Sequence, residues 1–89
     1  MKLEHVALQV TDPVAMASWY EEHLGMRVVH TGDAPGNARF LADDAGASVL
    51  ETYAGTLPVP DYGAMDPALL HVAFATEDVA ATRARLSPV

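Results

Sequence analysis

The stretch His5-Val6-Ala7-Leu8 returns near the end of the chain as His71-Val72-Ala73-Phe74. Two further identities keep the same spacing, because Asp12 corresponds to Asp78 and Ala15 corresponds to Ala81. In each copy a segment with period-two alternation leads to an aspartate and then to a helix-like stretch, which predicts a strand running into a capped helix. The chain therefore contains a repeated strand–helix unit, and this repeat decides the fold.

Working outward from the first copy, the pattern predicts one helix and four strands in the first part of the chain. Asp12 is placed to cap the helix, Pro13 suits its first turn, and Gly25 ends it by adopting a positive φ. A turn is expected at Asp43-Asp44-Ala45-Gly46, between the last two strands. The expected strands cover residues 3–10, 27–31, 38–42 and 47–53.

The second copy follows a proline-rich linker over residues 57–68. A fifth strand is expected at 69–75 and a short helix at 78–86. The order βαβββ, linker, βα predicts one α+β domain over residues 1–89, with a first module at 1–56 and a truncated second module at 69–89. Three explanations for the missing strands stay open: a shortened chain, strands supplied by another chain, or a degenerate second copy.

Composition excludes several classes of protein. The chain has 89 residues, is 51% hydrophobic and carries a formal net charge of −7. The apolar fraction is too high for a disordered chain, and the scattered basic residues argue against nucleic-acid binding. No apolar run is long enough for a membrane span, and the absence of cysteine excludes disulfides and zinc–thiolate sites. We expect a cytoplasmic protein. The basic residues are Lys2, Arg27, Arg39, Arg83 and Arg85.

Three polar side chains form a candidate metal-binding set. His5 and His71 occupy equivalent positions in the two copies and share their strand faces with small alanines, while Glu51 lies in the fourth expected strand. Two imidazoles and one carboxylate suit a divalent transition metal and leave coordination positions open for water or substrate. The competing interpretation is that the histidines are hydrogen-bonded side chains and that Glu51 is a solvated carboxylate.

At these residues the chain resembles the vicinal oxygen chelate superfamily, which includes glyoxalase I, extradiol dioxygenases and bleomycin-resistance proteins. The resemblance is carried by residues 3–10, by Trp19-Tyr20-Glu21-Glu22-His23-Leu24-Gly25-Met26, by residues 49–53 and by residues 70–74. It implies paired βαβββ modules around a cleft, with His5, Glu51 and His71 as ligands of Ni, Zn, Fe or Mn. The fourth ligand would come from the last strand of the second module, which this chain lacks, so the resemblance also implies a homodimer.

The resemblance implies a metal-dependent enzyme whose substrate chelates the metal through vicinal oxygens. A lyase or isomerase of the glyoxalase type would use Glu51 as the catalytic base, and a dioxygenase would use Fe(II). Arg39 and Tyr53 are the candidate substrate contacts. One alternative is a metal-free, drug-sequestering protein that holds its ligand with Trp19, Tyr20, Tyr53 and Tyr62. A second alternative is an interaction module whose unpaired strand edge binds another chain.

Overall fold

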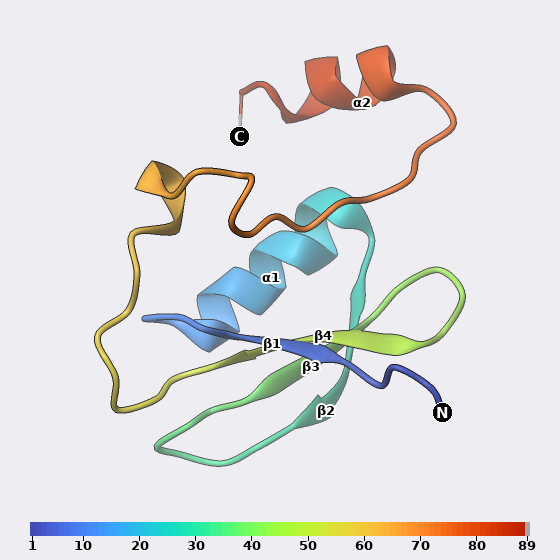
Figure 1. Cartoon of the computed structure of the whole chain (residues 1–89). Coiled ribbons are helices and arrows are strands. Elements are labelled where there is room, and N and C mark those ends of the chain that lie inside the picture. Colours follow the sequence, from blue (N-terminus) through green and yellow to red (C-terminus); the bar gives the residue numbers. More distant parts are fainter. Residues whose placement is uncertain (89) are drawn as a thin grey trace.

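The computed structural model describes residues 1–88, with the side chain of Ser48 left aside (Figure 1). A four-stranded sheet carries helix α1 (Pro13–Leu24) on one face, and the C-terminal segment with helix α2 (Val79–Leu86) lies on the same side (Figure 1). None of the helices in this described part is long and apolar enough to cross a membrane. The combination of a mixed sheet with two α-helices confirms the predicted α+β class.

The sheet has the order β1-β4-β3-β2, which leaves β1 and β2 at its edges. Strand β1 (Val6–Gln9) runs parallel to β4 (Ser48–Tyr53), and β3 (Arg39–Ala42) is antiparallel both to β4 and to β2 (Arg27–Thr31). The parallel pair requires a crossover connection, and α1 with the β2–β3 hairpin provides it. As a result, the first and last strands of the module lie side by side.

Local chemistry sets the ends of α1 as the sequence predicts. The Asp12 carboxylate accepts a hydrogen bond from the Ala15 backbone N–H at 3.0 Å, and Gly25 follows the helix with a φ of +68°. A residue with a side chain would be strained at this left-handed position. The helix begins and ends where the caps place it.

The core lies between α1 and one face of the sheet. Ala17, Met26, Leu41 and Leu50 are almost fully buried there. Thr52 is also fully buried, and its hydroxyl donates to the Pro13 carbonyl at 3.0 Å. This bond joins the start of α1 to β4. Among the described residues, no helix lies across the opposite face of the sheet (Figure 1).

The linker is held against the end of β1 by two hydrogen bonds. The Gln9 carboxamide donates to the Leu57 carbonyl at 2.6 Å, and the Tyr62 hydroxyl donates to the Gln9 carbonyl at 2.8 Å. Gly55 lies beside the Gln9 side chain, and a Cβ atom at residue 55 would collide with its carboxamide. A short 3₁₀ helix, η1 (Tyr62–Ala64), follows.

The expectation of a fifth strand at residues 69–75 is wrong for this structure. No strand is present between η1 and α2 in the described chain. A strand forms only when its backbone groups pair with a neighbour, and the first copy has β4 for that purpose. Within residues 1–88 the second copy has no corresponding partner, so its segment stays extended but unpaired.

The second helix of the repeat is present. Asp78 caps α2 by accepting from the Ala81 N–H at 2.9 Å, which reproduces the Asp12–Ala15 contact of α1. The Arg85 guanidinium donates to the His23 carbonyl at the end of α1 at 2.8 Å. The last residue of the expected second module, Val89, lies outside the described residues.

Candidate functional site

His5 and Glu51 meet on the face of the sheet opposite α1. Ala7 pairs with Glu51 in the parallel β1–β4 register, and His5 lies two residues before Ala7 on the same side. The His5 Nε2 atom is 3.2 Å from Glu51 Oε1, and the two side chains are 30% and 17% exposed. Two ionisable groups therefore converge on a partly screened part of the sheet.

The other imidazole nitrogen of His5 is also engaged. Its Nδ1 atom lies 2.8 Å from Oε1 of Glu4, a carboxylate that is largely exposed. When the ring is neutral it can donate from one nitrogen only, so one of these two carboxylates must give up its hydrogen bond. A neutral ring that donates to Glu4 leaves Nε2 free as an acceptor beside Glu51, which is the state in which imidazole binds a metal.

An aromatic row continues from this pair across the sheet. Phe40 in β3 is paired with Glu51 in β4, and its ring meets the His5 ring edge-on with centroids 5.4 Å apart. His30 in β2 is paired with Phe40, and these rings are also 5.4 Å apart. Each of the four strands, or the residue just before it, thus contributes one side chain to a row running His5, Glu51, Phe40, His30.

The sequence analysis missed Phe40 and His30. Alternation in residues 39–42 places Phe40 opposite Leu41, and Leu41 is an obvious core residue, so the signal for Phe40 was available. Alternation could not predict on which face of the sheet His30 lies. The β2–β3 register shifts between Val28 and His30, and a bulge of this kind reverses the expected parity of a side chain.

The two candidate substrate contacts lie on opposite faces of the sheet. Tyr53 is two residues after Glu51 in β4 and therefore shares its face. Arg39 is paired with Thr52, so it belongs to the face that carries α1. Its guanidinium donates to the carbonyls of Gly32, Asn37 and Ala38, at distances between 3.0 and 3.4 Å. Arg39 thus closes its own hairpin in this structure.

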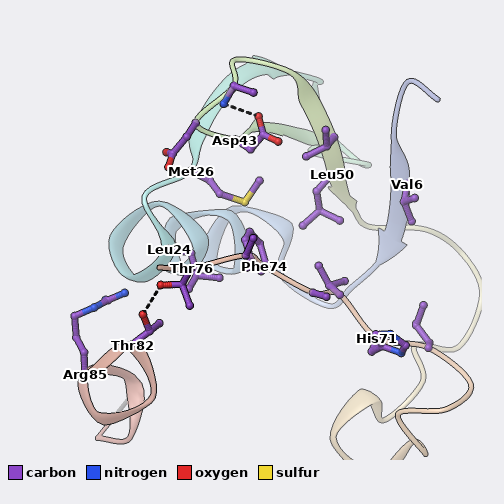
Figure 2. A pocket seen from close by; sticks show the side chains of 17 residues that line it. Val6, Leu24, Met26, Asp43, Leu50, His71, Phe74, Thr76, Thr82 and Arg85 are labelled. Carbon is purple, nitrogen blue, oxygen red and sulfur yellow. Dashed lines mark hydrogen bonds between the residues drawn. The ribbon is translucent and has the colours of Figure 1, made fainter. Parts of the chain in front are cut away.

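The structure does not bring His71 to the His5–Glu51 pair. His71 lines a cavity of about 670 Å³ on the α1 side of the sheet, together with Val6 and Leu50 (Figure 2). Its Nδ1 atom lies 2.8 Å from the Pro67 carbonyl. Within residues 1–88 no group of three His, Asp or Glu side chains is arranged to hold a metal ion.

Apolar side chains form most of the same cavity, which lies between the core and the C-terminal segment. Figure 2 shows His71 and Val6 at one end and Thr82 and Arg85 at the other, with Phe74 between them. The Phe74 ring lies 6.1 Å from the Tyr20 ring of α1, and this contact holds the segment against the helix side. The segment that carries His71 is thus separated from the His5 face by the sheet itself.

The four aromatic residues proposed for a metal-free ligand site are not gathered in one place. Trp19 and Tyr20 pack on each other along α1, with ring centroids 5.4 Å apart. Tyr62 is bonded to the Gln9 carbonyl, and only Tyr53 shares the face of Glu51. Burial raises the pKa of the Tyr20 hydroxyl, which is consistent with a packing role.

Comparison with known proteins agrees with this architecture. The sequence model of the Glyoxalase/Bleomycin resistance protein/Dioxygenase superfamily matches residues 2–88. The chain belongs to this superfamily. No curated protein and no solved structure matches it significantly. Superfamily membership confirms the resemblance drawn from the sequence.

For a glyoxalase-superfamily chain the donor set is of the right type but incomplete. His5 and Glu51 supply the nitrogen and oxygen donors that divalent transition metals accept, and they are adjacent. A catalytic metal site uses three protein ligands, and in the described residues the third donor lies elsewhere. Within residues 1–88, His5 and Glu51 therefore provide two donors side by side, one fewer than a catalytic metal site uses.

Proposed function

We propose that this protein is a divalent-metal-dependent enzyme of the glyoxalase/dioxygenase type, acting on a small substrate chelated through vicinal oxygens. The observation that supports this function is the convergence of His5 and Glu51 from adjacent parallel strands onto the uncovered face of the sheet, 3.2 Å apart. In such an enzyme the metal would polarise the substrate oxygens. Ni, Zn, Fe and Mn remain the candidate metals.

Within this proposal each residue of the site has a defined task. His5 would bind the metal through Nε2 when its Nδ1–H group donates a hydrogen bond to the Glu4 carboxylate. Glu51 has two oxygens and can use one as a ligand, or serve as the proton acceptor of a lyase or isomerase reaction. The Phe40 ring packs edge-on against the His5 ring, so it would shield one side of the imidazole from water.

The test is the metal content of the full chain, purified without a metal-affinity tag and measured by elemental mass spectrometry after incubation with each ion. We expect near-stoichiometric metal in the wild type and its loss in His5→Ala and Glu51→Gln. His23→Ala is the matched control, because His23 lies at the end of α1 and contacts Trp19 rather than the site. Unchanged metal content in His5→Ala would refute the proposal.

A second candidate function is metal-free binding of a small aromatic molecule, as in a drug-sequestering protein. The row of His5, Phe40 and His30 favours it, since ring faces and edges on an uncovered sheet can contact a planar ligand. Saturable binding that is unchanged by a chelator, and lost in Phe40→Ala, would support this function over the metalloenzyme.

A further inference from the structure

We propose that the cavity of about 670 Å³ between the core and the C-terminal segment binds a small amphipathic carboxylate, of the class of a medium-chain fatty acid. The apolar body of this ligand lies along the centre of the cavity, and its carboxylate lies at the end that Thr82 and Arg85 form (Figure 2). The cavity is on the helix side of the sheet, whereas His5 and Glu51 lie on the opposite face. Binding in the cavity therefore does not depend on the proposed metal site.

The first observation is a cavity of the size that a small molecule fills. Its volume lies within the range of about 300–1,000 Å³ that is usual for small-molecule sites. Well-packed protein interiors contain few voids larger than a water molecule, so a hollow of this size beside the core has room for a ligand. The contact between the Phe74 and Tyr20 rings holds the C-terminal segment over it.

The second observation is the apolar surface that the cavity leaves uncovered. Met26 and Leu50 belong to the core and line the cavity on that side. Val72 and Phe74 line it from the C-terminal segment and are still 44% and 43% exposed. Contact between water and apolar side chains is unfavourable, so an apolar ligand that replaces this water is stabilised by burial between the core and the segment.

The third observation is a pair of hydroxyl groups with a hydrogen left to donate. Thr76 Oγ1 lies 2.9 Å from Thr82 Oγ1, and it also accepts from the Asp78 N–H at 3.4 Å. Each hydroxyl carries a single hydrogen, and the bond between the two threonines uses only one of them. Within residues 1–88 neither hydroxyl donates to another protein group, so the pair can donate to an oxygen of a ligand.

Arg85 adds a positive charge at the same end of the cavity. Its guanidinium donates to the His23 carbonyl at 2.8 Å, and this bond holds the group beside the cavity. A guanidinium has several N–H donors in one plane, so donors remain for a ligand after this bond is made. Among the described residues, Arg85 forms no ion pair with a carboxylate of the chain. A carboxylate on the ligand matches both its charge and its planar geometry.

Two acidic side chains, Asp43 and Asp44, also line the cavity, from the turn between β3 and β4. Figure 2 shows Asp43 beside Met26, away from Arg85. Its Oδ1 atom already accepts from two backbone N–H groups of its own turn, at 3.0 and 3.3 Å. The negative charge of this turn disfavours a second anionic group on the ligand, so a monocarboxylate with an apolar tail fits the cavity best.

The experiment is an NMR titration of the metal-free full chain with octanoate and, separately, with octan-1-ol, which has the same chain length and no charge. We expect saturable shifts of the amides of residues 70–75 with both molecules, and tighter binding of octanoate. Arg85→Gln should weaken octanoate binding by about two- to fivefold, as expected for an exposed ion pair, and leave octan-1-ol binding unchanged. Unchanged octan-1-ol binding also shows that this variant is folded.

Two matched controls separate the site from general effects of charge and hydrophobicity. Arg83→Gln removes the same charge from the same helix, but Arg83 does not line the cavity, so neither molecule should bind more weakly. Val72→Asn places an amide in the apolar lining and should weaken the binding of both. Val59→Asn should leave both unchanged, because Val59 is similarly exposed, at 39%, but lies outside the cavity.

The absence of saturable shifts with octanoate would overturn the proposal. An equal loss of octanoate affinity in Arg85→Gln and Arg83→Gln would overturn the role of Arg85. Shifts centred on residues 5 and 51, and abolished in His5→Ala, would place octanoate on the opposite face of the sheet and would also overturn the proposal.

Discussion

At the scale of single residues, the Thr52 hydroxyl is the buried polar group on which the junction of α1 and β4 depends. We expect Thr52→Val to lower the free energy of unfolding by about 1 kcal/mol, because the hydrogen bond from its buried hydroxyl to the Pro13 carbonyl is lost. Urea denaturation measures this loss. Thr31→Val is the control, since Thr31 is exposed, and its effect should stay within about 0.5 kcal/mol. Equal losses in the two variants would contradict the prediction.

Ionisation of Tyr20 makes the stability of the folded chain depend on pH in the alkaline range. Burial raises its pKa above the usual value of 10.0. At pH values below the usual pKa the side chain is neutral in both the folded and the unfolded chain, so it does not make the free energy of unfolding depend on pH. Above it, the unfolded chain ionises first, and stability falls until pH passes the folded pKa.

We therefore expect Tyr20→Phe to remove this part of the alkaline loss of stability. The measurement is the free energy of unfolding as a function of pH, from pH 8 upward, in both proteins. The same alkaline slope in Tyr20→Phe and the wild type would show that Tyr20 does not cause it.

The site shows what residue patterns could and could not predict. Strand parity assigned His5 and Glu51 to faces of their own strands, and the family resemblance grouped them; the in-register pairing of β1 with β4 is what brings the two side chains together. The register shift between Val28 and His30 reverses the face on which His30 lies, so alternation in the sequence could not place His30 next to Phe40. His71 lines the cavity on the α1 side, because the segment that carries it pairs with no strand within residues 1–88, and alternation alone does not predict that outcome.

At the scale of elements, the two repeated caps offer a natural comparison. Asp12 and Asp78 make the same hydrogen bond to the third residue of the sequence that follows, at 3.0 and 2.9 Å. Helix α1 buries Pro13 and Ala17 against the sheet, whereas α2 has no buried residue. The caps are thus chemically equal but differ in how strongly their helices are coupled to the core.

We expect Asp12→Ala to lower the global stability by about 0.5–2 kcal/mol, and Asp78→Ala to leave the global transition almost unchanged. In the second variant only the helical signal of α2 should decrease, since that helix can fray without opening the core. Urea unfolding followed by tryptophan fluorescence and by circular dichroism separates the two effects. A global loss of the same size in Asp78→Ala would show that α2 is part of the cooperative unit.

Most elements of the first module could be predicted from sequence alone. β2 and α1 have the expected bounds, because alternation, Asp12 and Gly25 determine them locally. β1 begins at Val6 rather than at residue 3, since β4 pairs only with residues 6–9. The expected strand at residues 69–75 is absent for the same reason: the segment has the composition of a strand, but within residues 1–88 it has no neighbour to pair with.

At the scale of the whole molecule, net charge governs association. Each chain carries a formal charge of −7, so two copies repel each other at low ionic strength. We expect the homodimer that the family resemblance implies to tighten when sodium chloride is raised from about 10 mM to about 150 mM, because the Debye length then shortens from about 30 Å to about 8 Å.

Sedimentation equilibrium at the two salt concentrations measures this change directly. A dimer that dissociates as salt is added would show that opposite charges, rather than apolar contact, hold the copies together.

The contact between Gly55 and Gln9 has a consequence for how the sequence can diverge. Any side chain at residue 55 takes the space of the Gln9 carboxamide and costs the bond to the Leu57 carbonyl that holds the linker. We therefore expect substitutions at the two positions to be coupled. Lineages that keep glutamine at position 9 should retain glycine at position 55, and those that gain a side chain at 55 should carry a shorter residue at 9.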